Sequence, residues 1–250
     1  MKKAVFELEG TRNVILGALG SEEAARLGPH LRPRELRLGE EIARPGEMAG
    51  DVLFLEAGML SSILNSNQNV AVEVSVVGRE GVWDAFLALN EVPRLDHVIV
   101  QANGWGWALP GEVLRQEFGR GGSLQRSILR YFDLFYTQAA VTGVCNRLHT
   151  VEERLARWLL IVSNGAESDE FEVPAEFVAC MLGSRLSGVP IALGVLQQAG
   201  LVTVDGQLIR LLDAPALEST ACECHAALAR RLQIYLDDPR RPPRAAGHAP

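Results

Sequence analysis

The residues best suited to metal or redox chemistry are the cysteines and histidines of the second half of the chain. They are Cys145, His149, Cys180, Cys222, Cys224 and His225. Thiolate and imidazole are the ligands that zinc prefers, but paired cysteines of structural zinc sites are usually separated by at least two residues. Only one residue separates Cys222 from Cys224, and no second pair has the expected spacing. We therefore expect no metal and no other cofactor. Cys145 and Cys180 are expected to pack inside helices, and redox sensing by Cys222 and Cys224 is the alternative.

Catalytic chemistry has little support in the sequence. A metal-dependent barrel enzyme needs several histidine or carboxylate ligands that converge from its strands, yet His97 is the only histidine between His30 and His149. The chain also lacks a glycine-rich phosphate loop, a nucleophile elbow and a zinc-protease motif. We therefore expect no enzymatic activity.

A different pattern, in residues 174–212, predicts a winged helix-turn-helix. Pro174 suits the first turn of a helix, and Gly183 interrupts the apolar stripe that follows it. A second apolar-periodic run, 189–196, leads to Gly200, which suits a left-handed helix cap. Two alternating strands then flank Asp205-Gly206, a strong hairpin signal. Helix, turn, helix and hairpin is the order of a winged DNA-binding module.

The N-terminal part, from about residue 36 to residue 107, predicts an antiparallel roll. Short apolar segments alternate with glycine and proline turns, and 70–76 and 98–100 are the clearest strands. Residues 13–27 predict a short helical lead-in. The expected fold class is therefore α+β, with a jelly-roll-like β-roll before the winged helix.

A long amphipathic helix, 123–149, separates these two parts. Its apolar residues recur at three- and four-residue intervals. We expect a homodimer seam along this helix, and a buried helix within one domain is the alternative. The expected interface residues are Leu124, Ile128, Phe132, Phe135 and Ala139.

Composition and boundaries agree with a two-domain regulator. The chain has 250 residues, 48% of them apolar and 22% charged, with a net charge of −7. No apolar run is long enough to cross a membrane and no signal peptide is evident, so we expect a cytoplasmic protein without membrane contact. Thr150 and Glu153 form a capping box that starts a new helix. The expected divisions are 1–118 for the effector roll, 119–149 for the dimerisation helix and hinge, 150–236 for the winged helix, and 237–250 for a disordered tail.

Several motifs in this order resemble the Crp/Fnr-type transcription regulators along nearly the whole chain. The most specific is Asn146-Arg147-Leu148-His149 leading into 153–160, followed by Leu196–Leu201. The segments 39–42, 52–61 and 78–81 are similar to the strands and turns of the effector domain in that family. The resemblance implies a cyclic-nucleotide-binding-like roll, a dimerisation helix and a winged helix that reads a palindromic operator in double-stranded DNA. It also implies a homodimer, with RNA polymerase and a small-molecule effector as further partners.

The effector end departs from the cyclic-nucleotide sensors of that family. Those sensors hold the ribose with a Gly-Glu pair and the phosphate with an Arg-(Ser/Thr)-Ala run, whereas this chain has 83–86 and 94–97 at the comparable places. Asp96 would repel a phosphate, so we expect no control by cyclic AMP and either an unknown ligand or none. The iron–sulfur members use an N-terminal cysteine cluster, and no cysteine precedes Cys145. The candidate pocket residues are Gly78, Arg79, Glu80, Trp83, Asp84, Arg94 and Asp96.

The recognition helix is also atypical. We expect Ser187 to act as N-cap, so that Pro190 falls in the first turn without penalty. The alternative is an earlier start with a kink at Pro190. The expected DNA-contacting residues are Arg185, Ser187, Gly188, Pro190 and Ile191, which offer little hydrogen bonding, and we expect weak or conditional DNA binding. The competing function is a protein-interaction module that derives from this fold and has lost operator binding.

Overall fold

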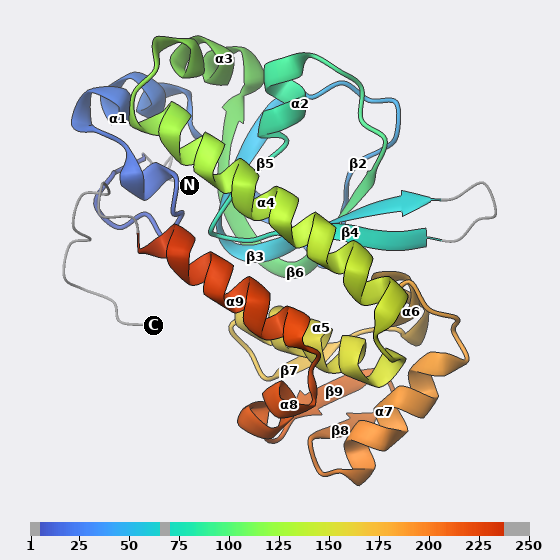
Figure 1. Ribbon diagram of the computed structural model, residues 1–250. Helices are drawn as coiled ribbons and strands as arrows, with labels where there is room; N and C mark the ends of the chain where they lie inside the picture. The colour runs from blue at the N-terminus through green and yellow to red at the C-terminus, as the bar shows by residue number, and fades with distance from the viewer. Residues whose placement is uncertain (1–5, 66–70, 238–250) are drawn as a thin grey trace.

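The computed structural model describes residues 6–65 and 71–237 and shows a β-roll above a small helical domain, with a long helix running diagonally across the roll (Figure 1). The N-terminal lead-in consists of the 3-10 turn η1 (Leu16–Ala18), the helix α1 (Ser21–Leu27) and the 3-10 turn η2 (Gly28–His30). Among the described residues, no helix combines the length and the hydropathy needed to span a bilayer.

The roll is one antiparallel sheet in which β6 and β3 are central, in the order β1-β6-β3-β4, with β2 paired to β6 and β5 paired to β3. Its strands are β1 (Arg32–Leu36), β2 (Glu41–Ala43), β3 (Asp51–Asn65), β4 (Ala71–Val77), β5 (Val82–Trp83) and β6 (His97–Pro110). The two long strands bend through several register shifts, which lets one sheet curl around its core. At one bend the backbones approach so closely that a Cβ on Gly104 would lie 2.1 Å from the carbonyl oxygen of Ala57. The expected strand 70–76 corresponds to β4, and its first residue lies outside the described residues.

Three helices follow or interrupt the roll: α2 (Ala85–Asn90), α3 (Gly111–Arg120) and the long α4 (Ser123–Leu148). The first half of α4 buries Leu124, Ile128 and Tyr131 in the core of the roll. Tyr131 lies so close to Gly81 that any side chain there would collide with its ring. Packing against the roll therefore fixes the direction of α4.

The C-terminal domain contains the expected winged helix and two further helices. Its elements are α5 (Val151–Ala166), β7 (Glu170–Glu172), α6 (Ala175–Met181), α7 (Gly188–Gln198), β8 (Val202–Asp205), β9 (Leu208–Leu211), α8 (Ala214–Thr220) and α9 (Glu223–Leu236). The predicted capping box starts α5, with the Thr150 hydroxyl accepting from the Glu153 amide. The hairpin turns at Gly206, whose φ of 61° favours glycine.

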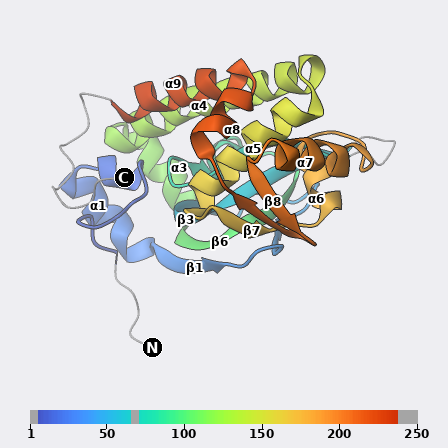
Figure 2. The ribbon, with the colours of Figure 1, turned by 90° about the horizontal axis from the view of Figure 1, so that it is seen from below.

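The last helix, α9, leaves the winged helix and lies alongside α4, as both views show (Figures 1 and 2). The two helices are antiparallel, because Cys145 near the end of α4 meets Cys222, whereas Asp133 further back pairs with Arg231. Tyr235 is buried in the core of the roll and donates a hydrogen bond to the Glu80 carbonyl at 2.8 Å. Residue 237 ends the described part, so the expected disordered tail, apart from Asp237, lies outside it.

A second apolar core joins the two domains. Met59, Ile63 and Val76 of the roll pack with residues of α5, α6 and α7. Glu73 of β4 is buried at this junction, where the Ser61 hydroxyl donates to its carboxylate at 2.6 Å. The winged helix is therefore packed directly against the roll.

Candidate nucleic-acid interface and effector region

The second helix of the helix-turn-helix begins at Gly188, as the sequence predicts, and Pro190 lies in its first turn. The position of the helix start therefore agrees with the prediction that Pro190 lies in the first turn, and not with the alternative of an earlier start and a kink at Pro190. Ser187 is the N-cap residue, as expected, but its side chain makes no capping hydrogen bond. Its backbone is already helical, with φ −62° and ψ −21°, whereas a side chain caps best from an extended backbone.

The outward face of α7 is largely apolar. Arg185, Ser187, Pro190 and Ile191 are exposed, and Gly188 is half-buried beside Val151. These are the five residues expected to meet DNA. The neighbouring Leu186 and Val195 are about half exposed.

Positive charge is sparse around this face. Arg185 is the only basic residue between 174 and 198. Arg154 is buried and donates to the Leu182 carbonyl at 2.6 Å, while Arg210 on the wing pairs with Glu170 at 2.8 Å. Phosphate contacts supply much of the affinity for DNA. Within residues 6–65 and 71–237, this surface lacks a cluster of cations that could make such contacts.

Four of the seven pocket candidates meet inside the roll. Arg94 and Asp84 form a fully buried ion pair at 2.5 Å, with Asp96 3.5 Å from the same guanidinium. The guanidinium also stacks over the Trp83 ring, 4.9 Å from its centroid. Burial raises the pKa of Asp84 to about 6, although Arg94 opposes this shift. The arginine is thus already matched by two carboxylates.

The other three candidates, Gly78, Arg79 and Glu80, contact different groups. Arg79 pairs with Glu167 at 2.7 Å, at the end of α5. The Gly78 amide donates to the Glu80 carboxylate at 2.8 Å. Burial raises the pKa of Glu80. The turn 78–80 therefore contacts the C-terminal domain, through Arg79 and Glu167, and is not part of the Arg94 cluster.

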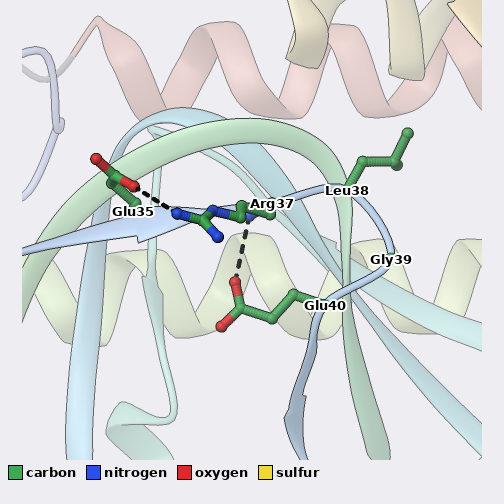
Figure 3. Close-up of a pocket in the computed structure, with 5 residues that line it drawn as sticks. All are labelled: Glu35, Arg37, Leu38, Gly39 and Glu40. Atoms are coloured by element: carbon green, nitrogen blue, oxygen red, sulfur yellow. Dashed lines mark hydrogen bonds and ion pairs between the residues drawn. The ribbon is translucent and has the colours of Figure 1, made fainter.

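A shallow hollow lies on the loop between β1 and β2 (Figure 3). Its charged groups are all paired: Arg37 pairs with Glu35 at 3.4 Å, and Glu40 pairs with Arg34 of β1 at 2.7 Å. The hollow therefore offers no unmatched charge to a ligand.

The expected seam residues do not share one surface of α4. Leu124 and Ile128 are fully buried in the core of the roll, and Phe135 packs against that core. Leu124 and Ile128 are therefore not available to a second chain, which corrects the expectation for these two residues, whereas Phe135 is only half-buried. Phe132 is exposed and Ala139 is half-buried. The large apolar residues that α4 exposes are Leu129, Phe132, Tyr136, Val144 and Leu148.

Three cysteines and one histidine, which their spacing in the sequence did not predict to form a metal site, lie close together in the structure. The ligand atoms of Cys145, His149, Cys222 and Cys224 all lie within 4.8 Å of one another. The expectation of no metal site rested on spacing along the chain, whereas α9 brings the second pair to the first from a distant position. The one available signal was the four-residue interval between Cys145 and His149, which places both on one helical face. Cys180 lies elsewhere, on α6, and His225 pairs with Glu218 at 3.7 Å.

The chain thus combines a β-roll, a long connecting helix and a helix-turn-helix domain with a β-hairpin wing. Residues 153–220 match the model of the Crp-like helix-turn-helix domain. No curated protein sequence matches the chain significantly.

Solved structures of Crp/Fnr regulators share the fold. A transcriptional regulator of the Crp/Fnr family from Eubacterium rectale is 15% identical, with a TM-score of 0.67, over 82% of this chain and 96% of that one. FixK2 from Bradyrhizobium japonicum is 18% identical, with a TM-score of 0.64, over 77% and 98%. The c-di-GMP-responsive regulator CLP from Xanthomonas campestris is 17% identical, with a TM-score of 0.63, over 78% and 100%. The resemblance to the Crp/Fnr regulators is confirmed: the chain joins a Crp-like helix-turn-helix domain to a roll of that fold.

Proposed function

We propose that the protein is a sequence-specific transcriptional regulator that binds DNA as a homodimer in the cytoplasm. The observation that carries this proposal is α7, which lies in a Crp-like helix-turn-helix domain and turns its exposed face away from both domain cores. A helix presented in this way fits the major groove of DNA. The sparse charge around it favours binding that is weak, strongly salt-dependent, or dependent on an effector or on RNA polymerase.

The exposed stripe on α4 supports the homodimer. Leu129, Phe132 and Tyr136 recur at helical spacing and are each about half exposed or more, although Phe132 also packs edge-to-face on Phe86 of α2. Two copies of this stripe would bury large apolar side chains against each other, which favours association. A symmetric dimer would present two α7 helices, as a palindromic operator requires.

The Arg94 cluster supports control by something other than cyclic AMP. A bound cyclic phosphate needs a cation that is not already neutralised, and Arg94 is held between Asp84 and Asp96. Catalysis is not part of the proposal, because the fold and domain are those of regulators.

Selection of genomic fragments by the purified protein, followed by gel-shift titration of the enriched sequences, tests the proposal. We expect a recurrent palindromic sequence, bound more weakly when Arg185 is replaced by Ala. Glu176→Gln, on the first helix of the motif, is a control that removes a charge without removing a cation. Equal binding to enriched and random fragments would contradict sequence-specific regulation.

A protein-interaction module is the alternative, and one observation favours it. Ile191 on α7 is 65% exposed, and Leu186 and Val195 lie near it with about half their surface exposed. An apolar patch of this kind is more typical of a protein contact than of a DNA-binding surface. Loss of genomic enrichment together with retention of a protein partner, abolished by Ile191→Glu, would select this alternative.

A further inference from the structure

The end of α4 and the beginning of α9 bring three cysteines and a histidine to one point. Cys145 lies in the last turns of α4, and His149 is its C-cap residue. Cys222 is the N-cap residue of α9, and Cys224 lies in its first turn. The antiparallel packing of α9 on α4 therefore closes the cluster.

The distances fit a single tetrahedral metal ion. The Sγ atoms of Cys145 and Cys222 are 3.5 Å apart, and the Sγ atom of Cys224 is 3.7 Å from Nδ1 of His149. A Zn–S bond of about 2.3 Å places neighbouring tetrahedral ligands roughly 3.8 Å apart. All four ligand atoms lie within 4.8 Å of one another. An iron–sulfur cluster spreads its four ligands over two or more irons, so at least some of the ligand atoms would lie farther apart than they do here.

The surroundings of the cluster also suit a metal. The three cysteines are buried and form a small core of their own with Val141. Nδ1 of His149 faces Cys224, while its other ring nitrogen, Nε2, lies 3.1 Å from the Glu223 carboxylate. Histidine ligands of metals usually make such a second bond to a carboxylate, which fixes the ring orientation.

A buried positive charge completes the setting. Three thiolates, one imidazole and one divalent ion carry a net charge of −1, which would be costly to bury alone. Arg157 of α5 is buried, acts electrostatically on Cys145, and has an Nε that makes no hydrogen bond among the described residues. Its charge would balance that of the occupied site.

We propose that Cys145, His149, Cys222 and Cys224 bind one Zn²⁺ ion and thereby pin α9 to the end of α4. The ion replaces the thiol protons, which are released to solvent on binding. The site adjoins His149 and Thr150, the junction between α4 and α5. A bound Zn²⁺ ion would therefore restrict movement of the junction between α4 and α5, and so fix the winged helix relative to the long helix.

The test uses the full chain, stripped of metal with a chelator and kept reduced. Titration with Co²⁺ should give the intense visible absorption of a tetrahedral thiolate complex at one ion per chain, and Zn²⁺ should displace it. Zn²⁺ should also raise the unfolding temperature, because it binds only the folded arrangement. Cys222→Ser and Cys224→Ser each remove a ligand atom. Each should weaken Co²⁺ binding by more than the roughly 10–100-fold loss that follows when a residue hydrogen-bonded to a ligand is replaced.

Matched controls separate the cluster from other cysteines and histidines. Cys180→Ser and His225→Gln should leave Co²⁺ binding unchanged, since neither residue belongs to the cluster. Glu223→Gln, at an exposed position, should weaken binding by roughly 10-fold or more without unfolding the chain. Three results would each overturn the proposal: no spectrum from folded, reduced wild type; a Cys145–Cys222 disulfide in place of metal; or several irons with sulfide per chain.

Discussion

Arg94 and Asp84 form an ion pair whose side chains are both about 2% exposed or less, 2.5 Å apart within the roll. Asp84 reaches this position from a left-handed backbone conformation, with φ 69°, at the start of α2. The carboxylate of Asp96 lies 3.5 Å from the other terminal nitrogen of the guanidinium, Nη1. The cation that a phosphate would need is thus committed to partners within the same chain.

Cyclic AMP and cyclic GMP should therefore show no measurable binding at physiological concentrations. A phosphate at Arg94 would add negative charge beside Asp84 and Asp96, the two carboxylates that already pair with this guanidinium, and this repulsion disfavours binding. Isothermal titration calorimetry is the measurement, with Arg79→Gln as a control at the exposed turn. A micromolar dissociation constant that disappears in Arg94→Gln would show that the arginine does serve a ligand.

The buried Glu73 should make the stability depend on pH. Burial raises the pKa of Glu73 to about 7, and Ser61 and Arg157 oppose this shift. Burial, together with the charge of Glu73, also raises the pKa of the nearby Cys180 thiol to about 11. Because the folded-state pKa of Glu73 exceeds its unfolded value of about 4.5, its contribution is fully present below pH 4.5 and is lost as pH rises through 7. Glu73→Gln should therefore match wild type near pH 4 and be more stable at pH 8, by up to about 3 kcal/mol.

Denaturant unfolding at several pH values measures this effect. Glu172→Gln, on the exposed strand β7, is the control and should leave the pH dependence unchanged. A wild-type-like pH profile for Glu73→Gln would mean that Glu73 stays ionised at the domain junction.

The exposed stripe of α4 predicts that Phe132→Glu with Tyr136→Glu yields a monomer. Burying such a stripe at about 25 cal/mol per Å² should favour association by several kcal/mol after entropic costs. Analytical ultracentrifugation at micromolar concentration checks the result, with Arg126→Glu as an exposed control on the same helix. Phe135→Glu should instead destabilise the fold, because Phe135 packs against the roll. An unmodified protein that sediments as a monomer would rule out the stripe as an interface.

The α4 helix shows how far periodicity alone can predict an interface. Both Ile128 and Leu129 lie in apolar-periodic positions, yet Ile128 is fully buried within the chain and Leu129 is 55% exposed. When a helix is apolar on two sides, the spacing of its apolar residues does not tell which side packs within the chain and which side is left for a second chain. Only the placement of the roll and α9 decides which side stays free.

The sequence predicts best those features that depend only on residues close together in the chain. The capping box at Thr150, the turn at Gly206 and the helix start at Gly188 follow from backbone preferences of nearby residues. The Cys145–Cys222 contact depends instead on how α9 folds back over α4. Spacing along the chain carries no information about such a contact, which is why the sequence argued against a metal site.

Replacing Pro190 by Thr together with Gly188 by Ser should tighten DNA binding. The two changes add hydroxyl groups to the first turn of α7, where the native residues provide no side-chain donor. Space permits them, because Pro190 is exposed and a Cβ on Gly188 would lie 3.8 Å from Val151, an ordinary contact. We expect affinity for the enriched fragment to rise roughly 10-fold at moderate salt, with Gln198→Ser, at the other end of α7, as an inert control. Fluorescence anisotropy at several salt concentrations measures the change. Nanomolar specific binding by the unmodified protein, abolished by the double change, would show that Gly188 and Pro190 themselves shape a tight contact with DNA.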